Sequence, residues 1–160
     1  MLSVTVLAVG RLKDKFYEDA SAEYLKRLGA YAKVQVVEVK AVDLPENASA
    51  AQTEEALQKE GRLLLSKLPE RCLAVALCIE GRLCSSEDVA SLLSDAALSG
   101  DSHVAFIIGG SCGLSDEVKA RADIKLSMSR MTFPHRLARV MLLEQLYRGF
   151  KIAKGEKYHK

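Results

Sequence analysis

A glycine-rich turn directly after an apolar run is the first place in this chain where chemistry could occur. The run Val104 to Ile108 is short and entirely apolar, which predicts a buried strand, and Gly109, Gly110 and Gly113 follow it at once. The glycine spacing is not G-x-G-x-x-G, and no Lys-Ser or Lys-Thr pair follows it, so both nucleotide-loop signatures are weak. The turn is therefore either a plain sharp turn or a backbone that lies against a flat ligand.

A second loop of the same kind follows the next predicted strand. Ile124 to Met128 predicts that strand, and a polar segment then leads through Pro134 and His135 into a long helix from Arg136. Small ligands of open α/β sheets bind where strands end at their carboxyl side. We therefore expect the active region between residues 104 and 150, although a histidine at a helix start, such as His135, is more often structural than catalytic.

The C-terminal segment is strongly basic. Residues 130 to 160 carry eight lysines and arginines against two glutamates, a net +6, although the whole chain has a net charge of only +2. A solvated helix face is one explanation of such a cluster. Because the cluster lies next to a predicted ligand loop, we favour an anionic partner such as RNA.

Metal and membrane chemistry are not indicated. The four cysteines, Cys72, Cys78, Cys84 and Cys112, contain no C-x-x-C pair, so we interpret them as small apolar residues in a reducing compartment. The apolar N-terminal segment 1–10 is too short to span a bilayer and lacks the features of a signal peptide. We expect a cytoplasmic protein with no metal and no membrane association.

The other predicted elements alternate between strand and helix. Predicted strands cover 4–9, 34–39, 73–79, 104–108 and 124–128, and predicted helices cover 14–28, 49–67, 86–98, a short stretch from 115, and 136–153. Ser49 and Gln52 form a capping-box pattern, and Glu80, Gly81 and Arg82 are expected to end the third strand. This order predicts a single α/β domain, residues 1–160, with a parallel sheet covered by helices on both faces. General topology rules predict that it is unknotted.

The last helix has more apolar surface than one face can hold. Its apolar residues are Leu137, Val140, Met141, Leu142, Leu143, Leu146, Tyr147 and Phe150. Complete burial is costly because basic residues interrupt them. We therefore expect part of this helix to pack against a second copy in a two-fold homodimer.

Four motifs, in order and at matching distances, resemble one known family. They are GG-S-C-GLS from Gly109, S-x-S-R-M-TFPH-x-x-x-RV from Ser127, E-Q-x-YR from Glu144, and the terminal G-E-x-YHK. Across residues 6 to 160 the chain resembles the ribosomal large-subunit pseudouridine N3-methyltransferases of the SPOUT class. The resemblance implies a C-terminal trefoil knot, which overrides the unknotted expectation, together with obligate dimerisation and S-adenosylmethionine as methyl donor. The implied substrate is a pseudouridine in helix 69 of 23S rRNA, within the assembled ribosome.

The resemblance also assigns residues to roles. It places the cofactor at Leu77, Gly109, Gly110 and the loop Met128, Ser129, Arg130, Met131, Thr132 and Phe133, where main-chain contacts are expected. It assigns catalysis to Arg148, Tyr158 and His159. Arg148 would steady negative charge, Tyr158 would contact the base, and His159 would accept the N3 proton. RNA contacts would come from His135, Arg136, Lys151, Lys154 and Lys157. Without the resemblance, the last three residues would be read as a frayed terminus.

Two alternatives stay open at this point. A non-catalytic ribosome-binding or RNA-binding module could use the basic C-terminal tail alone, and an α/β enzyme could use another nucleotide. The presence of both the glycine turn and the TFPH loop favours the methyltransferase, because a binding module has no use for a concave cofactor site.

Overall fold

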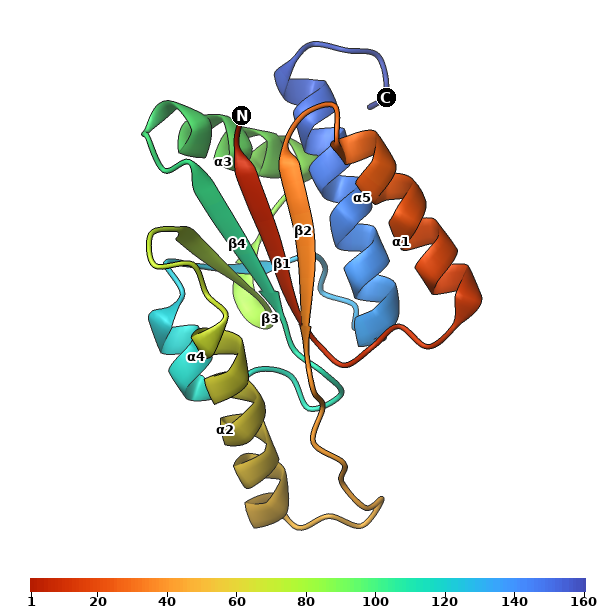
Figure 1. Cartoon of the computed structure of the whole chain (residues 1–160), viewed down its shortest axis with the longest axis vertical. Coiled ribbons are helices and arrows are strands. Elements are labelled where there is room, and N and C mark those ends of the chain that lie inside the picture. The colour runs from red at the N-terminus through yellow and green to blue at the C-terminus, as the bar shows by residue number, and fades with distance from the viewer.

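A five-stranded, all-parallel sheet forms the centre of the protein (Figure 1). The computed structural model describes all 160 residues. The strands are β1 (Ser3–Val9), β2 (Lys33–Val39), β3 (Leu73–Leu83), β4 (His103–Ile108) and β5 (Ile124–Ser127), in the spatial order β2-β1-β4-β3-β5. The helices are α1 (Lys15–Leu28), α2 (Ala50–Ser66), α3 (Ser86–Leu98), α4 (Asp116–Arg121) and α5 (His135–Ala153). The predicted alternation of strands and helices is confirmed.

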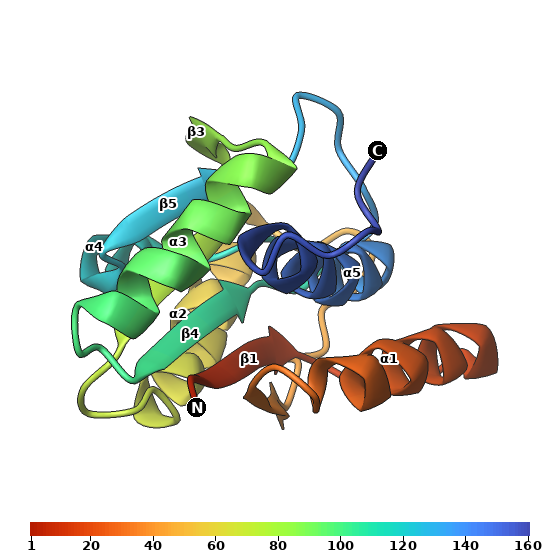
Figure 2. The ribbon, with the colours of Figure 1, turned by 90° about the horizontal axis from the view of Figure 1, so that it is seen from above.

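Helices cover both faces of the sheet, and each face has its own apolar core. Along β1, Val4 and Val6 point into the larger core, which α1, α3 and α5 close, whereas Leu7 and Val9 point into the smaller core under α2 and α4. Figure 2 shows α1, α5 and α3 seen from above. The near-continuous apolar composition of β1 and β4 therefore reflects burial on two faces, as parallel sheets require.

Short polar signals set the starts of three helices. Ser49 accepts a hydrogen bond from the N–H of Gln52 at 3.1 Å, and Gln52 accepts one back from the N–H of Ser49 at 2.8 Å, which confirms the predicted capping box of α2. Ser85 and Asp88 make the same arrangement at the start of α3. At α4, the Ser115 hydroxyl accepts from the N–H of Val118 at 3.3 Å, so the expected cap after the glycine turn is also present.

The third strand is longer than predicted. The expectation that residues 80–82 end it is wrong, because β3 pairs with β5 through Leu77 and again through Arg82, with a shift of register between them. Such a bulge bends a strand without ending its pairing. Ile79 lies within this irregular stretch and is 76 % exposed, so β3 is buried only in its first part.

Helix α5 contributes both to the core and to the ends of the first two strands. Leu142, Leu143 and Leu146 are buried in the larger core. Arg139 is only 2 % exposed, forms an ion pair with Glu38 and donates to the carbonyl oxygen of Gly10 at 2.9 Å. The remaining apolar residues of the predicted interface, Leu137, Val140, Met141 and Tyr147, are half-buried.

The structure contains neither a helix suited to span a membrane nor a cluster of metal-ligand side chains. No helix combines the length and the apolar character that a membrane span requires. No group of three or more histidine, cysteine, aspartate or glutamate side chains is placed to hold a metal ion.

Candidate functional site

A cavity of about 800 Å³ lies at the carboxyl side of β4, of β5 and of the first, regular part of β3, which ends at Leu77. Its walls come from residues 77–80 in the irregular stretch of β3, the glycine turn after β4, the loop after β5, and the first turn of α5. A volume of this order suits a cofactor-sized molecule, and its place in the sheet is the one at which open α/β folds bind ligands. Of the predicted cofactor residues, it is lined by Leu77, Gly109, Gly110, Met128, Ser129, Met131, Thr132 and Phe133.

The glycine turn is folded tightly back on itself. The N–H of Gly113 donates to the carbonyl oxygen of Gly110 at 3.1 Å, and a Cβ at position 109 would collide with the carbonyl group of Gly113. A Cβ at Gly110 would lie 3.1 Å from Val9 Cγ1 and 3.9 Å from Glu60 Oε1. A side chain at position 110 would therefore press on the protein behind the turn, instead of simply filling ligand space.

The loop after β5 is held by its own serines. The hydroxyl of Ser127 donates to the carbonyl oxygen of Ser129 at 3.0 Å, and the hydroxyl of Ser129 accepts from the N–H of Met131 at 2.9 Å. Ser127 thus donates and Ser129 accepts within the loop itself, and main-chain contacts from this loop to a cofactor stay a prediction. Arg130 is exposed and does not line the cavity, so the structure separates it from the other predicted cofactor residues.

The ionisable groups around the cavity are mostly kept in uncharged or paired forms. Burial lowers the pKa of His135, and the positive charges of Arg136 and Arg139 lower it further, which favours the neutral ring. Burial raises the pKa of the Cys78 thiol. Glu80 and Lys119 form an ion pair at the cavity wall. Sequence reasoning missed this pair, because the two residues lie on different elements and no local spacing connects them.

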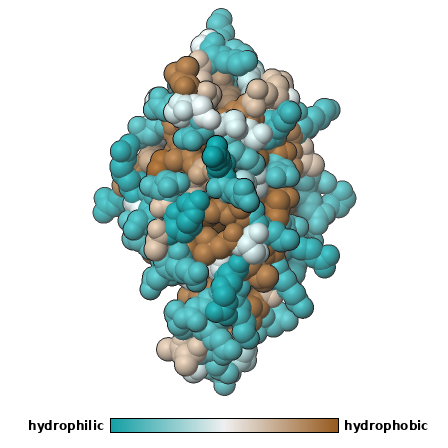
Figure 3. Space-filling view, turned by 60° about the vertical axis from the view of Figure 1, so that its left-hand side comes forward, coloured by the Kyte–Doolittle hydropathy of each residue, from teal (hydrophilic) through white to brown (hydrophobic).

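Large apolar side chains stay exposed around this region. Ile79 and Met131 line the cavity and are 76 % and 69 % exposed, and Leu83, at the end of β3, is 51 % exposed. The space-filling view, with the left-hand side of Figure 1 brought forward, shows apolar surface gathered in a hollow among hydrophilic residues (Figure 3). Exposed apolar surface next to a cavity is typical of a face that binds a ligand or another chain.

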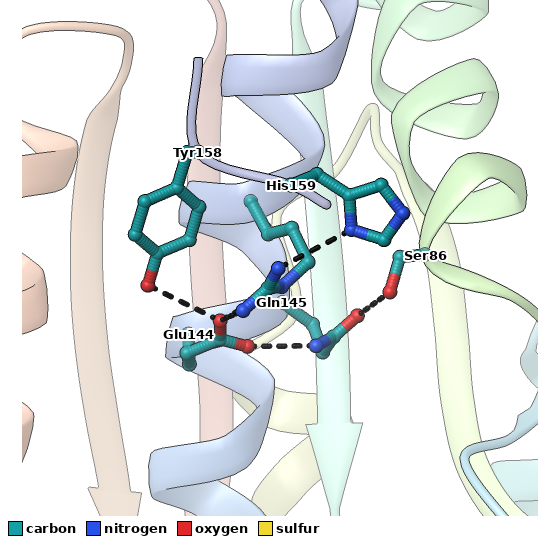
Figure 4. A network of polar contacts seen from close by, with 6 residues as sticks. Ser86, Glu144, Gln145, Tyr158 and His159 are labelled. Carbon is teal, nitrogen blue, oxygen red and sulfur yellow. Dashed lines mark hydrogen bonds and ion pairs between the residues drawn. The ribbon is translucent and has the colours of Figure 1, made fainter.

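The C-terminal tail folds onto the second half of α5, where Glu144 is the central acceptor. The Nε of Arg148 donates to Glu144 at 2.8 Å, and the hydroxyl of Tyr158 donates to the same carboxylate oxygen at 3.3 Å (Figure 4). The Arg148 guanidinium carbon lies 4.7 Å from the centroid of the Tyr158 ring. The hydrogen bond to Glu144 raises the pKa of Arg148, and burial together with Glu144 raises the pKa of Tyr158. Both side chains therefore keep their protons near neutral pH.

His159 joins this cluster to α3 through both ring nitrogens. Its Nδ1 lies 3.2 Å from Nη1 of Arg148, and its Nε2 lies 2.8 Å from Oε1 of Glu87. An arginine N–H can only donate, so Nδ1 is the acceptor and Nε2 carries the proton that faces the carboxylate. In this tautomer both ring nitrogens of His159 are engaged, so the ring in its contact with Arg148 and Glu87 has no free acceptor.

The structure thus brings together Arg148, Tyr158 and His159, and it adds Glu144 and Glu87. Glu144 could have been found, because it lies four residues before Arg148, at the spacing of a helical ion pair within the E-Q-x-YR motif. Glu87 lies 72 positions before its partner, and no sequence signal connects the two.

The predicted RNA-binding cations do not form one patch, and two of them are already paired. Arg136 lies 3.6 Å from Asp14, and the Nζ of Lys151 donates to Glu156 at 2.6 Å. Lys154 is exposed, with its ammonium 5.3 Å from the Tyr31 ring centroid, and Lys157 is exposed. His135 lines the cavity instead of the outer surface.

The two predicted halves of the site lie at opposite ends of α5. His135 is at the start of the helix beside the cavity, and Arg148 follows after a separation of about 20 Å at 1.5 Å per residue. Figure 1 shows the C-terminal tail at the top of the molecule, whereas β1, β2 and β4 run downward, so that their carboxyl ends point away from the tail. Within one chain, the predicted catalytic side chains therefore do not line the cavity that the predicted cofactor residues line.

Comparison with known families gives a full-length match. Residues 2–159 match the family model described as "Predicted SPOUT methyltransferase". The chain is 55 % identical over 159 residues to the "Ribosomal RNA large subunit methyltransferase H" of Pelotomaculum thermopropionicum, covering 99 % of both chains. It is 48 % identical to the protein of the same name from Carboxydothermus hydrogenoformans, covering 99 % of this chain and all of the relative.

Solved structures give the same fold at much lower identity. The crystal structure of a probable methyltransferase from Bordetella pertussis Tohama I aligns with a TM-score of 0.59 and 16 % identity, covering 92 % of this chain and 95 % of the other. At that identity the likeness concerns the fold alone.

Proposed function

The chain belongs to the SPOUT methyltransferase family, and from this premise we propose that it transfers a methyl group from S-adenosylmethionine to N3 of a pseudouridine in 23S rRNA. The proposed target lies in helix 69, on the assembled ribosome in the cytoplasm. Full-length relatives named as ribosomal RNA large subunit methyltransferases support an rRNA substrate. The observation that carries the proposal is the cavity at three strand ends, which gathers the glycine turn and the TFPH loop around one space.

The residues of the cavity fit S-adenosylmethionine. The half-buried Leu77 and Met128 offer apolar surface to a flat base, while the exposed residues 111–113 of the glycine turn offer backbone groups that could bind polar parts of the ligand. When bound, S-adenosylmethionine supplies a methyl group on a sulfonium, which is already a good leaving group for one in-line displacement. The chain therefore has to hold the donor, align the acceptor and help N3 lose its proton.

In a homodimer with shared sites, the cavity of one subunit could lie next to Arg148 of the other, although the two are far apart along α5 of one chain. Reacting atoms must approach to about 3–3.5 Å, whereas Arg148 lies about 15 Å along α5 from Ala138, the last residue of the helix that lines the cavity of its own chain. The tail of one subunit would therefore complete the cavity of the other. The half-buried apolar residues of α5 and the exposed Ile79 and Met131 support such an interface. We also propose that the single domain carries the trefoil knot of its class.

The tail residues have chemically distinct tasks in this proposal. Arg148 keeps its charge and would stabilise the negative charge that develops on the base as N3 is deprotonated. Tyr158 would stack on the base or donate a hydrogen bond to it. His159 would accept the proton, and this requires that Arg148 releases Nδ1 first, because the docked ring has no free acceptor. Binding of RNA phosphate by Arg148 would provide that release.

The decisive experiment combines binding with product analysis. S-adenosylmethionine is titrated into the purified protein by calorimetry, and 70S ribosomes are then incubated with the protein and methyl-labelled cofactor. We expect 3-methylpseudouridine in helix 69, found by mass spectrometry of nuclease fragments. Ribosomes with uridine at the target position are the control and should stay unmethylated.

The second candidate is a non-catalytic ribosome-binding module that uses the exposed Lys154 and Lys157. It predicts ribosome binding without measurable cofactor affinity. Cofactor binding together with transfer to the ribosome excludes it.

A further inference from the structure

We propose that two consecutive residues of α2, Glu60 and Gly61, are positioning residues that hold the glycine turn, residues 109–113, in the shape that binds the cofactor. Neither residue lines the cavity, so both act through the turn. The inference deepens the proposed function, because it assumes that the turn binds S-adenosylmethionine.

Gly61 supports the far end of the turn. It is buried, and a Cβ at this position would overlap the Ser115 hydroxyl and lie 3.2 Å from Val118 Cγ2. Ser115 is 4 % exposed, and its hydroxyl caps α4 immediately after the turn. Helix α2 thus packs its backbone directly against the residue at which the turn becomes α4. Only glycine allows this approach without displacing Ser115.

Glu60 supports the near end. It is 7 % exposed, and its Oε2 accepts a hydrogen bond from the N–H of Val42 at 2.9 Å. Its Oε1 lies 3.9 Å from the place that a Cβ at Gly110 would occupy. The carboxylate therefore connects the segment after β2 with the space behind Gly110.

The chemistry of Glu60 indicates a purpose beyond packing. Burial raises the pKa of its carboxyl, which means that the buried charged form is costly, and the bond from Val42 only partly offsets this. A leucine or methionine would fill the same space without that cost. A residue that binds one loop and lies behind another can fix the distance between them, which an apolar side chain does less specifically.

The two supports together bracket the turn. Gly110 at its start and Ser115 just beyond its end both face the same helical turn of α2. A movement of α2 at residues 60–61 would therefore shift both ends of the segment that lines the cavity. In a tightly packed interior such small movements are transmitted instead of absorbed.

The first test compares two helical glycines. Gly61→Ala places a methyl group against Ser115, whereas Gly149→Ala places one 3.1 Å from the flexible end of Leu93, in the other core. Affinity for S-adenosylmethionine is measured by calorimetry, and exchange of the amides of residues 109–113 is measured in the ligand-free protein. We expect Gly61→Ala to weaken binding roughly tenfold and to speed exchange in the turn, since overpacking displaces backbone. Gly149→Ala should change neither. Wild-type affinity and exchange in Gly61→Ala, or equal effects of both variants, would overturn the proposal.

A double-mutant cycle then locates the effect. In a Ser115→Ala background the atom that a Cβ at 61 overlaps is gone, so Gly61→Ala should cost clearly less affinity there than in the wild type. An unchanged cost in both backgrounds would mean that the substitution acts elsewhere in α2.

Glu60 is tested by rescue. Glu60→Ala leaves the N–H of Val42 without its acceptor and should weaken cofactor binding and speed exchange at Gly110, whereas Glu60→Gln keeps the acceptor and should restore most of both. Equal losses in the two variants would refute the role given to the hydrogen bond. If the wild-type protein binds no S-adenosylmethionine, the proposed function fails, but the exchange measurements still decide whether α2 holds the turn.

Discussion

The cavity and the tail cluster are built by different means. The cavity is lined by residues of three neighbouring strands and of the loops that follow β4 and β5, and buried residues fix these strands from both faces of the sheet. The tail cluster consists of charged and polar side chains around Glu144, held by ion pairs and hydrogen bonds on the outside of α5 and α3. The position of the cavity follows from the fold, whereas the tail cluster depends on a few contacts that single substitutions can remove. A substitution in one region should therefore leave the other region intact.

Removal of the last three residues should have the largest effect. Without Tyr158 and His159, methylation of 70S ribosomes should fall below detection, because the proposed base contact and proton acceptor are lost. Cofactor affinity should stay within about twofold, since the cavity is formed by other elements. Methylation at the wild-type rate would remove any catalytic role for the tail, and His135 would be the next candidate base.

Gly110→Val should have the opposite effect: cofactor binding is lost while the tail stays intact. Its side chain would crowd Val9 and Glu60 behind the turn, so we expect cofactor binding to be lost while the circular dichroism spectrum stays native. Unchanged affinity in calorimetry contradicts this prediction.

Mixing the tail-deleted protein with the Gly110→Val variant tests whether the cavity and the tail of different subunits act together. A dimer of one tail-deleted and one Gly110→Val subunit keeps one intact cavity and one intact tail on different chains, so co-refolded mixtures should recover up to about a quarter of wild-type activity if sites are shared. Sedimentation should show a dimer at micromolar concentration. No recovery in a proven mixed dimer speaks against sharing.

The lysines of the tail should contribute unequally to ribosome binding, because one of them is already paired with a glutamate. Lys157 is exposed, whereas Lys151 is paired with Glu156, which raises the pKa of Lys151. We expect Lys157→Ala to reduce the salt dependence of ribosome binding by a slope of about one, and Lys151→Ala to reduce it less. Binding that does not depend on salt would exclude phosphate contacts for both.

The smallest expected effect is a pH dependence of protein stability that arises from His135 at the cavity. Burial lowers the pKa of His135 in the folded state, so the unfolded chain takes up its proton at higher pH than the folded protein does. Stability should therefore decrease as pH falls through about 6.5, the ordinary value for histidine. His135→Gln should be less sensitive than the wild type in urea unfolding at pH values on both sides of 6.5. Equal sensitivity would show that His135 is protonated equally in both states.

The contrast also explains what the sequence could predict. The alternation of strands and helices along the chain, the capping box at Ser49 and the turns at Gly109 and after β5 all follow from periodicity and local turn chemistry. The continuation of β3 past Gly81 did not, because it depends on pairing with β5 from a distant part of the chain. For the same reason the Glu87 contact with His159 could not be predicted, since it is a tertiary contact with no local signature.

The position of α5 has a consequence for how the protein reaches its fold. Helix α1 packs against α5, and Arg139 contacts Glu38 and Gly10, so the N-terminal quarter of the chain is covered by residues that are translated much later. Parallel strand pairing likewise joins distant segments, as β1 does with β4. Such a high contact order predicts slow folding, and the apolar faces of α1 and β2 stay exposed until α5 has been synthesised. We therefore expect the nascent chain to bind chaperones, and truncations that remove α5 should aggregate, whereas loss of the last three residues leaves this cover in place.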